Sequence, residues 1–266
     1  AILRRAQQDP PADEAAQVSL FFYLGVVHQL GDPPATEDAV AYYDAALALR
    51  PDHMLARYNR ALAFLDRGWS GDVARALTDF SRVIDRHPSY LPAYIGRGVA
   101  YFYRGAPDDE EAAVRDFSYV IQVDPTRPLA YYNRGLIEIR QDERAGWEED
   151  LTRTIDLAPT FSGGYSALCW GYVLENEPTR AMPFCDQAID LGAAEALHSR
   201  GIAWALQGET DAALEDFRAF LRWLAGGSRA AAAYQHLAPE VEGWVQALEA
   251  GRPALLPEEL ARLRRE

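Results

Sequence analysis

Apolar residues recur along this chain at helical spacing, with polar residues between them. Four prolines divide the pattern into similar blocks at intervals of 37, 37 and 34 residues: Pro51, Pro88, Pro125 and Pro159. Each block reads as two helices, an aromatic-rich one such as PAYIGRGVAYFYRG (92–105) and a second such as AAVRDFSYVIQVDP (112–125). Helix pairs that repeat in this way bury their apolar faces by stacking on one another, so the pattern predicts an all-α repeat array.

Fixed positions within the blocks carry residues of fixed size. The first helix has a small residue at Gly25, Ala61, Gly98, Gly135, Cys169 and Gly201. The second helix has an alanine in five of the six blocks, at Ala39, Ala76, Ala113, Ala181 and Ala213. The fourth block has Trp147 at this position. Four residues later stands a residue that is mostly bulky, at Tyr43, Phe80, Phe117, Leu151, Cys185 and Phe217. Two helices approach closely only where one side chain is small and a bulky neighbour fills the flank.

This arrangement resembles the tetratricopeptide repeat. The resemblance implies a right-handed α-solenoid of six antiparallel helix pairs over residues 16–225, with limits near 16–51, 52–88, 89–125, 126–159, 160–192 and 193–225. Residues 1–15 form a lead-in, and residues 226–266 are expected to form capping helices, because the last repeat of a solenoid otherwise exposes an apolar face. Extra residues stand between the two helices of the first three blocks, at Pro33-Pro34, at 69–71 and at 106–108.

Charged residues appear at two of these positions only as partners. Four blocks have an arginine before the small residue and an aspartate before the bulky one: Arg60 with Asp79, Arg97 with Asp116, Arg134 with Asp150, and Arg200 with Asp216. The other two blocks have neither. An unpaired charge between packed helices is unfavourable, so we expect four ion pairs inside the repeats. The alternative is a basic strip that binds acidic ligands.

The fifth block departs most from the pattern. Cys169 and Cys185 occupy its small and bulky positions, and we expect reduced thiols that pack as small apolar groups. Pro183 lies within its second helix and is expected to bend it, because proline removes a backbone hydrogen bond.

Composition excludes some classes of partner. The formal charge is −14 and all 26 basic residues are arginine, so nucleic acid and anionic lipid are not expected partners. No run of residues is long and apolar enough for a membrane span. The five histidines and two cysteines have no metal-ligand spacing, and no phosphate loop, HExxH or GxSxG motif is present. We therefore expect no enzyme activity, no cofactor and no metal. Acidic runs such as 108–111 are expected to face solvent.

The resemblance implies that the first helices line a concave groove. The residues left on that face are largely apolar, and the central set is Phe22, Tyr58, Asn59, Leu62, Ile95, Phe102, Tyr103, Tyr132, Asn133, Leu136 and Trp170. Similar residues follow in the fifth and sixth blocks at Val173, Leu174, His198, Ile202 and Leu206. Such a surface indicates a site for a partner protein, unless curvature or the C-terminal tail buries it.

Some members of this family hold the C-terminal carboxylates of a partner with lysine, asparagine and arginine. Asn59 and Asn133 match asparagine positions of that clamp, but Phe22 and leucines stand at the lysine positions and the chain contains no lysine. We therefore do not expect carboxylate-clamp function.

Three functions stay open from the sequence. The first is a protein–protein interaction scaffold that binds an apolar peptide or helix in its groove. The second is a regulatory or sensor segment of a larger protein or enzyme, and the third is a structural scaffold that assembles with itself. Because the first residue is Ala1 rather than Met, the chain can be a trimmed product. A cytoplasmic location is favoured, while an exported or lipid-anchored mature form stays open. The oligomeric state is not determined.

Overall fold

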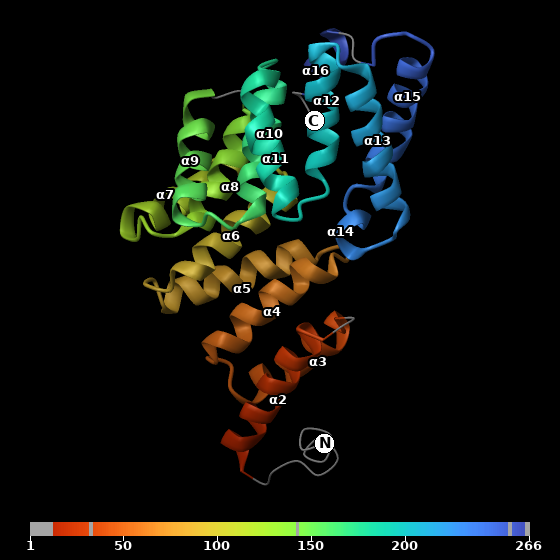
Figure 1. Ribbon diagram of the computed structural model, residues 1–266. Coiled ribbons are helices and arrows are strands. Elements are labelled where there is room, and N and C mark those ends of the chain that lie inside the picture. Colours follow the sequence, from red (N-terminus) through yellow and green to blue (C-terminus); the bar gives the residue numbers. More distant parts are fainter. Residues whose placement is uncertain (1–12, 32–33, 142–143, 255–256, 264–266) are drawn as a thin grey trace. The chain divides into compact units, whose positions relative to one another are not determined.

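The computed structural model describes residues 13–31, 34–141, 144–254 and 257–263, and all regular structure within them is helical. Most of the expected lead-in, Pro33 of the first insertion and the last three residues lie outside the described residues. Six antiparallel helix pairs follow one another along the chain (Figure 1): α2 (Glu14–Gln29) with α3 (Thr36–Leu49), α4 (Met54–Arg67) with α5 (Asp72–Arg86), α6 (Leu91–Arg104) with α7 (Asp109–Val123), α8 (Pro128–Arg140) with α9 (Arg144–Leu157), α10 (Ser162–Leu174) with α11 (Pro178–Asp190), and α12 (Ala196–Gln207) with α13 (Thr210–Ala225). The fold is the predicted all-α solenoid.

The chain divides into two compact units, residues 1–125 and 126–266. The first unit holds the first three helix pairs, and the second holds the other three and the C-terminal helices. The division falls between two repeats, but the repeat pattern gives no sign that the array divides there.

Small and bulky positions meet inside each helix pair. A Cβ atom added to Gly98 would lie 2.6 Å from the ring of Phe117, and one added to Gly25 would lie 2.5 Å from the ring of Tyr43. Both rings are buried. An alanine at either glycine would therefore require the ring or its helix to shift, which explains why these positions are small.

Trp147 stands where the other repeats have alanine, and it is almost fully buried. A Cβ atom on Gly171 of the next repeat would lie 2.7 Å from the indole, so a glycine makes the room that the large ring needs. The indole also meets the Tyr172 ring edge to face at 5.1 Å between centroids.

The C-terminal residues form the expected capping helices: α14 (Arg229–Ala232), the 3₁₀ helix η1 (Gln235–Leu237), α15 (Ala238–Glu249) and α16 (Pro257–Leu263). α15 packs against α13 through the buried stripe of Val241, Trp244 and Leu248. α16 reaches α10, and its Leu260 and Leu263 are buried.

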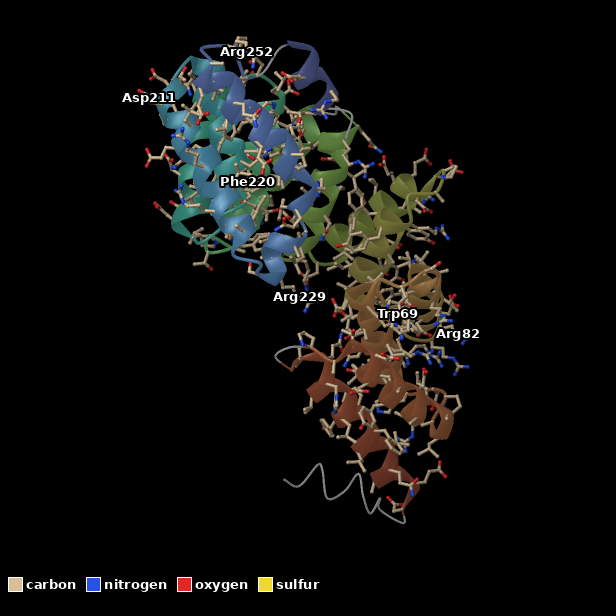
Figure 2. All side chains as sticks on the ribbon, turned by 90° about the vertical axis from the view of Figure 1, so that its right-hand side faces the viewer. Trp69, Arg82, Asp211, Phe220, Arg229 and Arg252 are labelled. Carbon is tan, nitrogen blue, oxygen red and sulfur yellow. A yellow bond between two sulfur atoms is a disulfide. The ribbon has the colours of Figure 1, made fainter. Side chains whose placement is uncertain are left out.

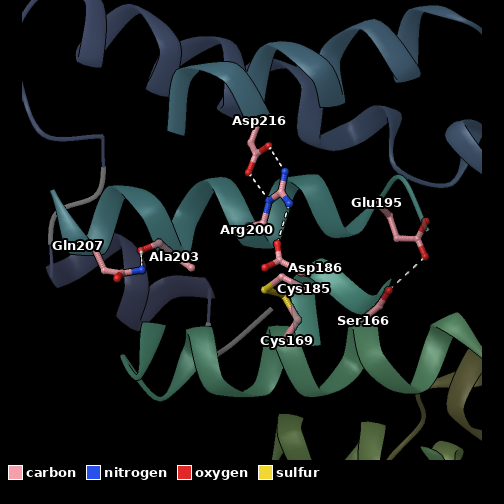
Figure 3. Close-up of a disulfide and its surroundings, with 9 residues drawn as sticks. All are labelled: Ser166, Cys169, Cys185, Asp186, Glu195, Arg200, Ala203, Gln207 and Asp216. Atoms are coloured by element: carbon pink, nitrogen blue, oxygen red, sulfur yellow. Dashed lines mark hydrogen bonds and ion pairs between the residues drawn. A yellow bond between two sulfur atoms is a disulfide. The ribbon is translucent and has the colours of Figure 1, made fainter. Parts of the chain in front are cut away.

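The prediction of reduced thiols is wrong. Cys169 of α10 and Cys185 of α11 form a disulfide, with the Cα atoms 5.0 Å apart, and both residues are fully buried (Figure 3). The cysteines occupy the small and bulky positions, which the fold brings together in the four repeats that have glycine at the small position. Two thiols at that contact lie at disulfide distance, so the covalent bond takes the place of the small-to-bulky packing.

Pro183 lies inside α11, which runs without interruption from Pro178 to Asp190. Since proline has no N–H group, the helix lacks the bond from residue 183 to the carbonyl of Thr179. The side of the helix at Pro183 is exposed, so water can reach the unbonded carbonyl. Whether α11 bends there stays a prediction.

Candidate functional site

All four arginine–aspartate pairs that the sequence indicates are present, and each uses two parallel hydrogen bonds. In the third repeat Arg97 donates from Nε and Nη2 to Asp116 over 2.8 and 2.7 Å. The corresponding distances are 2.7 and 2.8 Å for Arg60 with Asp79, 2.6 and 2.8 Å for Arg134 with Asp150, and 2.7 and 2.7 Å for Arg200 with Asp216. The four aspartates are buried. Such bidentate pairs leave the arginines committed to the fold rather than to a basic strip.

The pairs also alter the acidity of the arginines. The hydrogen bonds that Arg97 and Arg134 donate to Asp116 and Asp150 hold the pKa of each arginine above its usual value, although burial opposes this. These guanidinium groups therefore stay charged at every physiological pH.

A third contact joins consecutive repeats. The Nη1 atom of Arg60 donates to Asp44 over 2.6 Å, and Nη1 of Arg200 donates to Asp186 over 2.7 Å (Figure 3). Each of these aspartates directly follows the bulky position of the preceding repeat. The sequence contains this signal, but it becomes visible only when consecutive repeats are compared.

A second kind of ion pair closes the turns between helices. Arg67, at the end of α4, donates to Asp72 at the start of α5 over 2.8 and 2.7 Å, and the Trp69 amide donates to the same carboxylate. The third repeat repeats this arrangement with Arg104, Asp109 and the Ala106 amide. The bonds from arginine hold the pKa of Asp72 and of Asp109 below its usual value.

Asp109 therefore contradicts the expectation that the acidic run 108–111 faces solvent, because its side chain is buried and paired. Its neighbour Glu111 is exposed as expected. The signal for the turn pair was an Arg-Gly end followed by aspartate at a fixed distance, as in RGWSGD (67–72) and RGAPDD (104–109).

In the first unit the predicted groove residues are only partly covered. Phe22, Leu62, Ile95 and Phe102 are partly buried, while the Tyr103 side chain is 64% exposed. Two further apolar side chains of the first helices are also well exposed, Tyr23 at 58% and Leu55 at 40%.

The Tyr58 side chain packs into the core more than its predicted place in the groove indicates. Its ring meets the rings of Phe80 and Tyr90 edge to face, at 5.8 and 5.2 Å. Burial raises the pKa of its hydroxyl to about 12. Tyr58 therefore belongs largely to the core of the first unit.

The two asparagines already have partners within the chain. Asn133 donates from its amide nitrogen to the Leu129 carbonyl over 2.6 Å. Asn59 hydrogen bonds the hydroxyl of Tyr43. These bonds use part of the capacity that a partner backbone would need.

In the second unit the predicted groove is largely filled. Tyr132 meets the Phe161 ring at 5.0 Å, and Tyr132, Leu136 and Trp170 pack against the hydrophobic core. The residues of the same face in the fifth and sixth repeats, Val173, Leu174, His198 and Ile202, are buried. Leu263 of α16 and Trp244 of α15 lie in the same core cluster. The C-terminal helices therefore account for part of the face that the sequence assigned to a partner.

His198 is the most unusual residue of that face. Its imidazole lies against Trp170, Phe220 and Trp244, with ring centroids 5.8, 5.4 and 5.6 Å away. Its Nε2 atom has no hydrogen-bond partner in the part of the chain that the structure describes. Burial, together with the nearby charge of His236, lowers the pKa of His198 to about 4. The residue is therefore a neutral core histidine at physiological pH.

Within the described residues, no three histidine, cysteine or acidic side chains gather closely enough to hold a metal ion. In the same part of the chain every helix is too short or too polar to cross a bilayer.

The geometry is that of a helical-repeat solenoid, a fold that suggests a protein-interaction scaffold and whose known members are generally non-catalytic. The tetratricopeptide repeat family model matches residues 36–68 and 70–117. With the helix-pair architecture and its small and bulky positions, this match supports a tetratricopeptide repeat protein. No curated protein matches the sequence.

Solved structures share the fold. A tetratricopeptide repeat protein from Parabacteroides merdae is 21% identical with a TM-score of 0.66, over 81% of this chain and 82% of that one. A thermophilic TPR protein from Thermus thermophilus is 25% identical with a TM-score of 0.57, over 68% and 98% of the two chains. PilW, a type IV pilus biogenesis factor, is 18% identical with a TM-score of 0.66, over 82% and 98%.

Proposed function

We propose that this protein is a non-enzymatic interaction scaffold whose first unit binds an apolar peptide or helix of a partner protein. The proposed site is the face that the first helices α2, α4 and α6 share. The family supports protein partners as a class, and the face within this unit is a proposal from its residues.

One observation carries the proposal. Tyr103 stands 64% exposed beside the partly buried Phe102, although the solenoid offers buried positions for aromatic side chains throughout. Leu55 and Tyr23 extend the same character to α4 and α2. Exposed apolar residues that continue over several elements mark interaction sites, and aromatic residues supply much of the binding energy there.

The second unit contributes less to such a site. Most of its counterparts at the fifth and sixth repeats are buried in the core cluster that includes the C-terminal helices, and Trp170 and Leu206 are partly buried, so they offer little surface to a partner. Tyr132 also packs on Phe161, and its truncation would disturb the core as well as any surface.

The test begins with a photo-crosslinking amino acid at position 103, which identifies the partner and the segment bound. The affinity of that purified segment is then measured for the double variant Phe102→Ala/Tyr103→Ala. Loss of two central anchors is expected to weaken binding about a hundredfold or more. The melting temperature should change less than the affinity does, since Tyr103 is mostly exposed and Phe102 is only partly buried.

Tyr119→Ala is the matched control, because Tyr119 is an exposed aromatic residue of the same unit on a second helix, α7. Its affinity should equal that of the wild type. Equal affinity of the groove variant and the wild type would exclude this face as the site.

A further inference from the structure

A cavity of about 470 Å³ opens between α3, α4 and α5 in the first unit. Its charged lining consists of four arginines and two aspartates, Arg60, Arg67, Arg75, Arg82, Asp44 and Asp79, and Phe64 also lines it. None of these belongs to the proposed groove. Four cations in one cavity are unexpected in a chain of net charge −14.

Three of these arginines lie around one aromatic ring. Phe64 is buried, and the guanidinium carbons of Arg60, Arg67 and Arg75 lie 5.8, 5.4 and 5.7 Å from its centroid. Like charges this close repel one another unless anions offset them.

The positive charges of two of these arginines are balanced by aspartates of the same unit. Arg60 has Asp79 and Asp44, and Arg67 has both oxygens of Asp72. These contacts are the repeat pair and the turn pair already described.

The charges of the other two arginines, Arg75 and Arg82, are not balanced by such close aspartate pairs. The Arg75 side chain is 63% exposed, and its ion pair is a 3.6 Å contact with Asp72, which Arg67 already engages. Arg82 is exposed, and within the described residues no ion pair or hydrogen bond joins its side chain to the rest of the chain. Its side chain extends outward from the first unit (Figure 2).

The next repeat shows that the fold does not require these two arginines. At a distance of 37 residues, Arg97–Asp116 and Arg104–Asp109 reproduce both structural pairs. Ala112 and Tyr119 stand there in place of Arg75 and Arg82. The same helix–turn–helix is thus built without the two extra cations, which points to a different role for them.

An exposed aromatic residue adjoins the cavity. Trp69, in the turn between α4 and α5, is 52% exposed, and the Arg67 guanidinium stacks over its ring at 4.0 Å. A partner that reaches the cavity would therefore meet an apolar contact beside the charges.

We propose that this cavity is a second interaction site, which binds clustered carboxylates of a partner protein segment through Arg75 and Arg82, with Trp69 as the adjoining apolar contact. Guanidinium forks match carboxylates in geometry, as Arg60 and Arg67 show in the same cavity. An extended nucleic acid would meet the acidic remainder of the surface, whereas a short acidic segment stays within the roughly 8 Å range of the local cations.

The test uses a fluorescein-labelled peptide of consecutive glutamates flanked by leucines, and its affinity is measured by fluorescence anisotropy. Arg75→Gln/Arg82→Gln is expected to weaken binding about tenfold, because it removes two exposed ion pairs. Trp69→Ala should weaken it further, and added salt should reduce the affinity of the wild type but hardly that of the double variant.

The matched control is Arg115→Gln/Arg153→Gln, which removes two exposed arginines outside the cavity and should bind the peptide as the wild type does. Equal binding by both double variants, or no binding by the wild type, would overturn the proposal. Tighter binding of inorganic phosphate or of a single-stranded oligonucleotide than of the peptide, lost in Arg75→Gln/Arg82→Gln, would overturn the assignment to carboxylates. The groove variant Phe102→Ala/Tyr103→Ala should bind the glutamate peptide as the wild type does. The experiment therefore tests this site independently of the proposed groove.

Discussion

Arginine serves in this chain as a fixed structural cation. In the repeat pairs its planar fork binds both oxygens of a buried aspartate, and its third nitrogen can reach the preceding repeat, as in Arg60 with Asp44. A lysine has one ammonium group and could not make these contacts together. The geometry therefore gives a physical use for arginine at these positions in a chain without lysine.

The Arg97–Asp116 pair provides a prediction at this scale. Arg97→Met leaves a buried carboxylate without its cation, so it should destabilise the first unit by ~3 kcal/mol or more. The double variant Arg97→Met/Asp116→Leu removes both charges and should recover much of that loss. Urea unfolding of both variants measures the difference. A double variant as unstable as the single one would show that the pair matters for more than its charges.

His198 is the residue with the clearest dependence on pH. Its pKa is about 4 in the folded chain and about 6.5 in an unfolded one, so the unfolded state binds the proton more readily. Its contribution to stability is thus fully present above about pH 6.5 and is lost as the pH falls toward 4. The shift corresponds to ~3 kcal/mol.

Replacing His198 by Phe should remove this loss, because Phe suits the pocket of Trp170, Phe220 and Trp244 and binds no proton. The measurement is urea unfolding of the second unit between pH 7 and pH 4.5, for this variant and for the exposed control His87→Gln. The control should lose stability in acid as the wild type does. Asp72 and Asp109 lose their contribution only below their usual pKa, in a lower pH range. Parallel curves for wild type and His198→Phe would contradict the prediction.

At the scale of helices, most of the repeat could be predicted because its rules are local. The spacing from small to bulky residue fixes which side chains meet, as Gly98 and Phe117 show. The same rule placed Cys169 opposite Cys185 but could not tell a thiol pair from a disulfide, since both suit the contact. These rules do not predict the turn pairs, such as Arg67 with Asp72, because each pair joins residues outside the repeat positions.

The disulfide gives the prediction at this scale. It closes a loop of 16 residues, and such a loop is expected to contribute ~3 kcal/mol. Reduction should therefore lower the melting temperature of the second unit. The variant Cys169→Gly/Cys185→Leu copies the Gly135 and Leu151 packing of the fourth repeat, and its melting temperature should not respond to reductant.

Thiol titration of the unreduced, denatured chain is the direct check, and it should find no free thiol. Two free thiols, with equal melting temperatures before and after reduction, would show that the cysteines pack without a bond.

At the scale of the whole molecule, local rules were insufficient for the candidate site. Helical spacing correctly named the residues that share one face, but their exposure depends on segments far along the chain. Trp244 and Leu263, which lie outside the repeats, join the core cluster that holds Val173 and Ile202. Nothing in the repeat pattern shows where a C-terminal helix will dock, so the face at the fifth and sixth repeats was assigned to a partner.

The division of the chain leads to the last prediction. The core cluster that includes Trp147, Leu168 and Phe217 lies wholly within residues 126–266, and the cluster of Tyr43 and Phe80 lies wholly within residues 1–125. Because a core that is complete within one segment does not need the other segment to form, residues 126–266 expressed alone should fold. The fragment should show helical circular dichroism, a cooperative melting transition and the Cys169–Cys185 bond. It should also keep the acid sensitivity that His198 confers. A fragment that stays unfolded until residues 1–125 are added in trans would show that the two units depend on each other for stability.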